Sequence, residues 1–303
     1  MSRATATALL IVATIIWGSA FIAQKSAMGA MQPLTFLAAR YLLGGLLILP
    51  LAIWESRRIN KPISKRGWQL IGLLLIAFFF GSWLQQIGLL TASVTNTGFL
   101  TGFYVFFVPI LMVVFTKAKL HRLIWVSAAL AFAGLYLLSG GKVENFVAGD
   151  YFVLASSFFW AMYVFFLGTT AKTTQRPITV SAIIFIIGGS VCAAGAFGTE
   201  TVSLEAMRIG WVEILYTGVL STAIGFTLHT ISQQHVPTAN AALILSMESL
   251  FAAIGAAIIL GERLSALGYL GIVLIFSAII LAEAGPVFFE KARLRKSSLK
   301  QSI

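Results

Sequence analysis

The sequence has 303 residues, of which 59% are apolar and only 10% are charged, whereas about 25% of the residues in an ordinary soluble domain are charged. So few charges cannot cover the surface of a soluble protein of this size, so the chain is expected to be immersed in lipid. The formal net charge is +11, but the basic residues fall in short loops between apolar runs. That distribution indicates membrane orientation and argues against nucleic-acid binding. A single cysteine, Cys192, excludes an intramolecular disulfide, and we expect no metal framework and no cofactor.

Apolar segments long enough to cross a bilayer, which takes about 20 residues each, follow one another along the chain. Ten are expected, at 6–24, 33–54, 67–90, 92–115, 121–139, 149–170, 178–197, 210–233, 238–260 and 265–283. Backbone polar groups in lipid must be satisfied within each segment, so only helices fit runs of this length. Pro33, Pro177 and Pro237 stand where segments begin, a position that tolerates proline. The sequence therefore predicts an all-α membrane protein with ten transmembrane helices.

The distribution of lysine and arginine predicts how the chain is oriented. If the N-terminus is cytoplasmic, the loops and the tail on that side hold 16 of the 21 basic residues and the opposite loops hold 4. The remaining one, Arg40, lies within a span. Because basic residues favour the cytoplasmic side, both termini are expected there, with residues 284–303 forming a basic cytoplasmic tail.

An internal repeat divides the chain into two halves. A shift of 144 residues places Gly44-Gly45 on Gly188-Gly189, Gly81 on Gly225, Asn96 on Asn240 and Leu120 on Leu264. In the first helix the register is one residue shorter, and Trp17 pairs with Trp160. The constant offset predicts two five-helix repeats, at 6–139 and 149–283. Since five is odd, the second repeat must enter the membrane with opposite polarity, an architecture typical of transporters with a site at the midplane.

Two motifs carry a resemblance to a known family. The Trp-Gly-Ser-Ala-Phe run from Trp17 to Phe21 and the Gly-Glu-Arg-Leu turn at 261–264 resemble the drug/metabolite transporter superfamily, EamA type. The resemblance covers about residues 7–283 and implies a cavity between helices one to four and six to nine, with the fifth and tenth outside. The stretch from Gly98 to Tyr104 fits one branch, and the chain looks most like aromatic and neutral amino-acid exporters of the YddG kind. The first repeat departs from the pattern, with Lys-Ala-Lys-Leu at 117–120 in place of Gly-Glu-Arg-Leu.

Polar residues within lipid are expensive and are therefore candidates for function. Arg40 and Glu248 are expected about 5 Å apart in depth, at about 1.5 Å of rise per residue. They either form a structural ion pair or meet the carboxylate and the ammonium group of a zwitterion. His229, at the repeat position of Gln85, is either a hydrogen-bonded histidine between helices or part of a cavity.

Aromatic residues deep in the spans are candidates for the wall of a cavity. Trp17 and Phe21 share one helical face, Ser156, Trp160 and Tyr163 share another at i, i+4 and i+7, and Trp83 also lies deep in its span. Stripes that mix hydroxyl and aromatic groups favour a wet wall, with tight helix packing as the alternative. Gln86, Asn96 and Asn240 are expected to bind solute or bridge helices, and the two asparagines could instead cap helices.

Three residues in the fourth span are candidates for a hinge. Gly98 and Gly102 form a small-xxx-small pair that allows another helix to approach closely. Pro109 removes a hydrogen bond to the carbonyl of Val105 and is expected to kink the helix. The kink is either static or part of gating.

These features predict a secondary transporter that exports neutral or aromatic amino acids, or similar small metabolites, by alternating access. No G-x-x-x-x-G-K-[ST] loop and no soluble domain are present, which excludes ATP-driven pumping. Uncoupled flux is expected, because Glu248 is the only acidic residue near the midplane and Arg40 would hold it ionised. The alternatives are proton-coupled antiport of a drug, nucleoside or sugar derivative, and a channel. An enzyme would need a paired constellation. Apart from His121, Asp150 and Glu213 near segment ends, the spans hold only His229, Glu248 and Glu283 as His, Asp or Glu.

The expected partners are a small organic solute and the lipid bilayer, with no nucleic acid. We expect a monomer or a homodimer, and the resemblance to a transporter family places it in a bacterial inner membrane.

Overall fold

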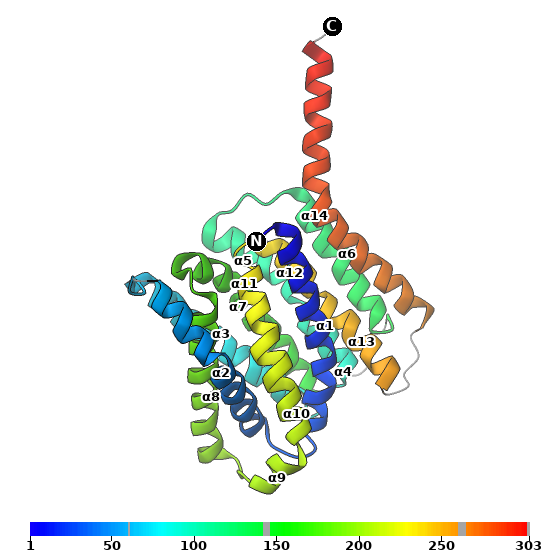
Figure 1. The fold of residues 1–303 in the computed structure, drawn as a ribbon. Helices are drawn as coiled ribbons and strands as arrows, with labels where there is room; N and C mark the ends of the chain where they lie inside the picture. Colours follow the sequence, from blue (N-terminus) through cyan, green and yellow to red (C-terminus); the bar gives the residue numbers. More distant parts are fainter. Residues whose placement is uncertain (60, 142–145, 260–264, 302–303) are drawn as a thin grey trace.

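The computed structural model describes residues 1–59, 61–141, 146–259 and 265–301, with side chains up to Glu283. All regular secondary structure in these ranges is helical, and the helices form one bundle (Figure 1). The elements are α1 Arg3–Ala27, α2 Pro33–Arg58, α3 Lys65–Gly88, α4 Val94–Thr101, α5 Tyr104–Thr116, α6 Arg122–Leu138, α7 Ala148–Thr174, α8 Pro177–Thr199, α9 Leu204–Ile209, α10 Trp211–Leu215, the π-helix η1 Tyr216–Phe226, α11 Thr227–Ser232, α12 Thr238–Leu245, α13 Met247–Ile259 and α14 Ala266–Gln301.

In the described part of the chain, nine helical segments are long and apolar enough to cross a membrane. The span expected at 121–139 forms α6, which is apolar but has 17 residues. The last span continues beyond Glu283, and the end of α14 projects from the bundle on the side where the N-terminus lies (Figure 1). The Gly-Glu-Arg-Leu turn at 261–264 lies outside the described residues. The cytoplasmic placement of both termini stays a prediction.

Helices α2 and α8 hold each other in an antiparallel pair through two carboxylates. Each helix begins with a proline, as expected, so its next two backbone N–H groups need acceptors. Glu200, at the end of α8, accepts both of these N–H groups of α2 at 2.8 Å. Glu55, in the last turn of α2, accepts those of α8 at 3.3 and 2.7 Å. A negative charge at a helix N-terminus is stabilising, and the reciprocal arrangement suits two copies of opposite polarity.

The fourth span of each repeat is broken near its middle. In the first repeat α4 ends and α5 begins around Gly102, and in the second the break falls at Ser246, which is 144 residues further on. The N–H of Phe103 bonds to the carbonyl three residues earlier, at 3.2 Å, so the helix tightens there. Pro109, where a kink is expected, lies inside the continuous helix α5. A side chain at Gly102 would meet Leu135 of α6 at 2.5 Å, so glycine allows this close approach.

The eighth span, Trp211–Ser232, contains a π-helical segment that the sequence did not predict. Its middle part, η1, has 11 residues with wider hydrogen bonding than an α-helix. Segments of this kind are rare, are usually one turn long, and are frequent at functional sites. It packs against α1 and α2.

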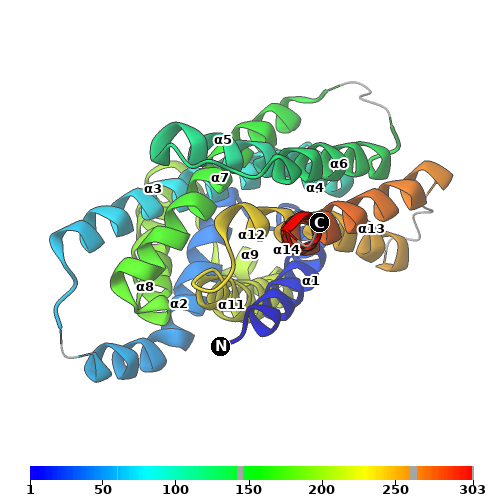
Figure 2. The ribbon, with the colours of Figure 1, turned by 90° about the horizontal axis from the view of Figure 1, so that it is seen from above.

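Helix packing follows the repeat. The second helices of the two halves pair as α2 with α8 and the last helices as α6 with α14, while α3 packs on α7 and α1 on η1, α11 and α13. Seen from above, α6 lies at the edge of the bundle (Figure 2). Two tryptophans share one geometry: Trp17 covers Gly225 and Trp160 covers Gly81, where an added Cβ would lie 2.7 and 3.2 Å from the respective ring. These residues are repeat equivalents, so the two halves meet in the same way.

Candidate functional site

A cavity of about 50 Å³ lies at the centre of the bundle. The lining residues come from both halves: Trp17, Phe21, Gln24, Arg40, Tyr41, Gln85, Thr101, Tyr104, Trp160, Tyr163, Val164, Ser221, Phe226, His229, Leu245 and Glu248. In the described chain, α6 and α14, the fifth and tenth helices, contribute no lining residue. The walls are mainly aromatic and apolar, with a few convergent polar groups, as in most small-molecule sites.

Seven of the twelve residues proposed for a substrate cavity line this space. They are Trp17, Phe21, Arg40, Trp160, Tyr163, His229 and Glu248. The remaining five are Trp83, Gln86, Asn96, Ser156 and Asn240, and none of them lines the cavity. Each contacts either another helix or a different residue of its own helix.

Three of these five are turned away from the cavity by local contacts. Ser156 donates to the carbonyl of Val153 in its own helix at 2.6 Å. Gln86 donates to a main-chain carbonyl of α1 at 3.2 Å and is fully buried. Trp83 stacks on Phe79, with ring centroids 5.8 Å apart. Depth in the membrane is therefore a poor guide here, because the direction of a side chain around its helix decides what it meets.

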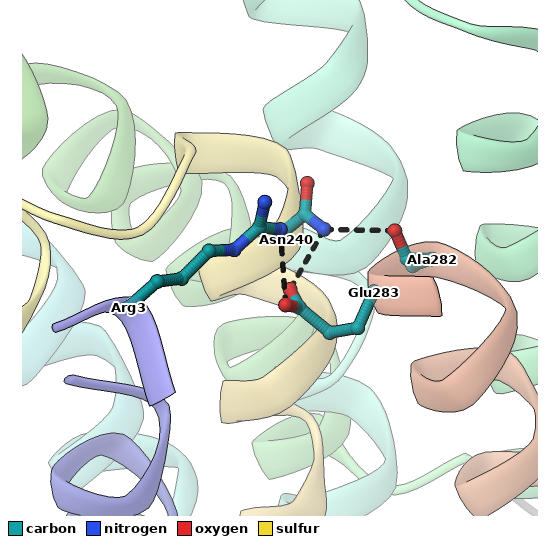
Figure 3. Close-up of polar contacts among 4 residues, drawn as sticks. All are labelled: Arg3, Asn240, Ala282 and Glu283. Atoms are coloured by element: carbon teal, nitrogen blue, oxygen red, sulfur yellow. Dashed lines mark hydrogen bonds and ion pairs between the residues drawn. The ribbon is translucent and has the colours of Figure 1, made fainter. Parts of the chain in front are cut away.

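The two asparagines join helix ends. Asn96 does not cap α4, since Ser93 does so, and its side-chain amide donates instead to Asp150 at 3.5 Å. Asn240 donates to the carboxylate of Glu283 at 2.7 Å and to the carbonyl of Ala282 at 3.0 Å (Figure 3).

Glu283 also forms an ion pair with Arg3 at 2.9 Å, so this cluster joins α1, α12 and α14 at the end of the bundle where the chain begins (Figures 1 and 3). Asn240 is thus used in holding helix ends together, away from the central cavity.

Arg40 enters the cavity from α2 and is only 3% exposed. Its Nε donates to the hydroxyl of Thr222 at 3.3 Å and its Nη2 to that of Ser221 at 3.0 Å, both on η1. Its guanidinium also lies 5.0 Å from the ring centroid of Tyr41. Of the two alternatives for Arg40 and Glu248, the structural ion pair is wrong, because the two side chains form no salt bridge in the structure as described. The guanidinium instead donates hydrogen bonds to hydroxyl groups of the π-helix.

The same π-helix is held from α1. The indole Nε1 of Trp17 donates to the carbonyl of Ser221 at 3.1 Å, and Ser19 shares a hydrogen bond of 2.6 Å with Tyr216. Arg40 and Trp17 therefore both line the cavity and both donate hydrogen bonds to η1.

Several polar atoms at the cavity have no hydrogen-bond partner. Among the described residues ten buried side-chain nitrogen and oxygen atoms are unpaired, and five of them belong to four cavity residues. They are the hydroxyl of Tyr104, Nε1 of Trp160, both ring nitrogens of His229 and Oε1 of Glu248. An unpaired buried polar group costs about 1–3 kcal/mol, so such groups call for a partner. Their convergence on one cavity indicates a place for water or a polar ligand.

Sequence reasoning missed some of the lining residues, of which Tyr104 is the most informative. A shift of 144 residues places it on Glu248, so the repeat register could have found it. The same register pairs Gln85 with His229, and Gln85 donates to Thr101 at 2.9 Å at the cavity wall. In the described ranges no three His, Cys, Asp or Glu side chains come together as metal ligands would.

Comparison with known proteins assigns the fold to a family. The sequence pattern of the EamA-like transporter family matches twice, at residues 4–140 and 147–283. The chain belongs to the EamA-like transporter family. A solved structure has the same fold over 93% of this chain and 98% of its own, with a TM-score of 0.77 and 16% identity. The EamA-like fold accounts for multiple apolar helices, and the chain is a multi-pass membrane transporter.

Several EamA-like relatives carry names. An uncharacterized transporter of Archaeoglobus fulgidus is 29% identical over 90% of this chain and 83% of its own length. The uncharacterized inner membrane transporter YedA of Escherichia coli is 23% identical over 91% of this chain and 89% of its own length. The threonine/homoserine exporter RhtA of Salmonella typhimurium is 28% identical over 69% of this chain and 77% of its own length. These proteins are named as transporters, and none is named as an enzyme.

Proposed function

We propose that this transporter exports neutral amino acids from the cytoplasm through the central cavity by alternating access. The observation that carries the proposal is the set of unpaired polar atoms on Tyr104, Trp160, His229 and Glu248, in the same cavity as the guanidinium of Arg40. An amino acid offers a carboxylate for the guanidinium and an ammonium group for the carboxylate. The threonine/homoserine relative supports this solute class.

The rest of the cavity favours an uncharged side chain. Arg40 and Glu248 are its only Arg, Lys, Asp or Glu among the described lining residues, and both are used by the two ends of the zwitterion. Trp17, Trp160 and Phe226 supply flat apolar surfaces for the remainder of the solute. Small aliphatic, hydroxylated and aromatic amino acids all meet these conditions, which agrees with the resemblance to aromatic and neutral amino-acid exporters.

Alternating access is supported by how the site is assembled. The cavity takes residues from both repeats, and the fourth span of each repeat is broken beside it, at Gly102 and Ser246. Broken helices and a site between repeats are the arrangement found in many secondary transporters. A channel of like residues from several subunits would instead line its pore at a subunit interface. The relative from Escherichia coli supports placement in a bacterial inner membrane.

Counterflow in liposomes tests the proposal. Vesicles loaded with one unlabelled compound are diluted into a trace of the same compound in labelled form, and uptake is measured for a panel of amino acids, amines, sugars and nucleosides. Neutral amino acids are expected to exchange, and compounds lacking either the carboxylate or the ammonium group are expected to exchange poorly. Exchange of sugars or nucleosides in place of amino acids would overturn the proposal.

A further inference from the structure

Glu248 and Tyr104 occupy the same position in the two repeats. Each is two residues beyond the break of its fourth span, Glu248 after Ser246 and Tyr104 after Gly102. Both line the cavity, and they are only 6% and 3% exposed. The Tyr104 hydroxyl and the Glu248 carboxyl lie close enough to interact, but no hydrogen bond of normal geometry is made by the Tyr104 hydroxyl or by Oε1 of Glu248 in the described structure.

No fixed cation faces this carboxyl from the helices packed against it. α13 contacts α1, α4, α6 and α12, whose basic residues are Arg3, Lys25 and Arg122, all at helix ends. Arg3 pairs with Glu283, Lys25 donates to a carbonyl at the end of α3 at 2.7 Å, and Arg122 is exposed.

The other titratable or charged groups of the cavity also leave Glu248 without a counter-charge. Arg40 is bonded to the hydroxyls of η1, Tyr41 donates to Ser82 at 2.7 Å, and Tyr163 and His229 carry no hydrogen bond to the carboxyl. A lone carboxylate in such a place is costly unless it meets a cation or takes up a proton. The cavity offers it two mobile cations: a proton from water and the ammonium group of the solute.

We propose that Glu248 binds these two cations in turn, so that one proton enters for each amino acid exported. This inference rests on the proposed function. In the outward step the carboxylate holds the ammonium group, and the solute leaves as a zwitterion. The carboxylate then takes a proton from the external side, returns as a neutral acid, and releases the proton to the cytoplasm when the next amino acid binds. Each cycle moves one positive charge inward.

Tyr104 acts as the positioning residue for this exchange. Its hydroxyl can donate a hydrogen bond to the carboxylate or accept one from the protonated acid, so it can support both states of Glu248. The expectation of uncoupled flux depended on a salt bridge from Arg40, and the structure removes that reason.

The experiment uses purified protein in liposomes with an acidic lumen and the membrane potential clamped. An amino acid that exchanges in counterflow is the probe, and its uptake is recorded with the pH of the lumen. With one proton per solute, a gradient of one pH unit should drive about tenfold accumulation, with one proton leaving per molecule taken up. Glu248→Gln should lose gradient-driven accumulation and pH dependence while it keeps counterflow at raised solute concentration. Glu205→Gln, at an exposed acid of α9, is the matched control and should behave like the wild type.

The outcomes separate the two proposals. If no amino acid exchanges in counterflow, the proposed function fails. If exchange occurs but the wild type neither accumulates solute against its gradient nor moves protons, the coupling is wrong and the exporter remains. Uphill accumulation in Glu248→Gln would place coupling elsewhere. If Glu248→Gln does not fold, Glu248→Asp and Tyr104→Phe are measured: unchanged pH dependence in both, with wild-type rates, would also overturn the inference.

Discussion

Replacing Arg40 by glutamine separates its binding role from its structural one. The amide nitrogen of glutamine takes the place of Nε and can still donate to the hydroxyl of Thr222, which Nε now contacts at 3.3 Å. Trp17 and Ser19 of α1 also hold η1, so it should stay in place. It cannot offer a positive charge to a carboxylate. Truncating one side of a buried charge pair costs about 2–5 kcal/mol, and each factor of ten in affinity is about 1.4 kcal/mol. Arg40→Gln should therefore raise the half-saturating concentration of an amino acid at least about 30-fold.

The assay compares each amino acid with the amine that lacks its carboxylate, as competitors in counterflow. The wild type should prefer the amino acid strongly, and Arg40→Gln should lose most of that preference while its affinity for the amine changes little. If the variant weakens both ligands by the same factor, Arg40 acts only by supporting η1 and the assigned role is wrong. Arg208→Gln, at an exposed residue of α9, is the control and should leave both values unchanged.

The two remaining predictions concern the cavity walls. Gly225→Ala would place a Cβ 2.7 Å from Nε1 of Trp17, and overpacking of this kind costs about 1–3 kcal/mol. It should lower the thermal denaturation midpoint in detergent more than Gly81→Ala, whose Cβ would lie 3.2 Å from the ring of Trp160. Equal losses in the two variants would contradict the idea that the closer approach at Gly225 costs more stability. Tyr163→Cys, in a Cys192→Ser background, should react with a water-soluble thiol reagent more slowly when amino acid is present, and complete inertness would show that this wall is closed to water.

Helix placement could be read largely from the sequence. Lipid is the solvent, so the length and apolar content of a segment decide whether it spans, and the prolines at 33 and 177 begin α2 and α8 as expected. Apolar content does not predict changes of helix geometry within a span. The break at Gly102 and the π-segment Tyr216–Phe226 depend on how neighbouring helices pack, and Pro109, the strongest local signal, leaves α5 continuous.

The candidate site shows the same limit at the scale of one residue. Gln85 lines the cavity, whereas Gln86 donates to a carbonyl of α1, although neighbouring residues on a helix differ by only about 100° in direction. Both faces of such a helix are apolar enough for lipid or for packing, so composition cannot fix the rotation. Contacts between helices fix it.

The membrane class of the chain, most of its helix boundaries and the repeat register follow from the amino-acid order, because these depend on apolar content and on spacing along the chain. The register even links Tyr104 to Glu248. Which polar groups meet depends on how the helices pack. Arg40 is bonded to η1 and not to Glu248, because the rotation and approach of α2, η1 and α13 set those distances and no single helix carries that information.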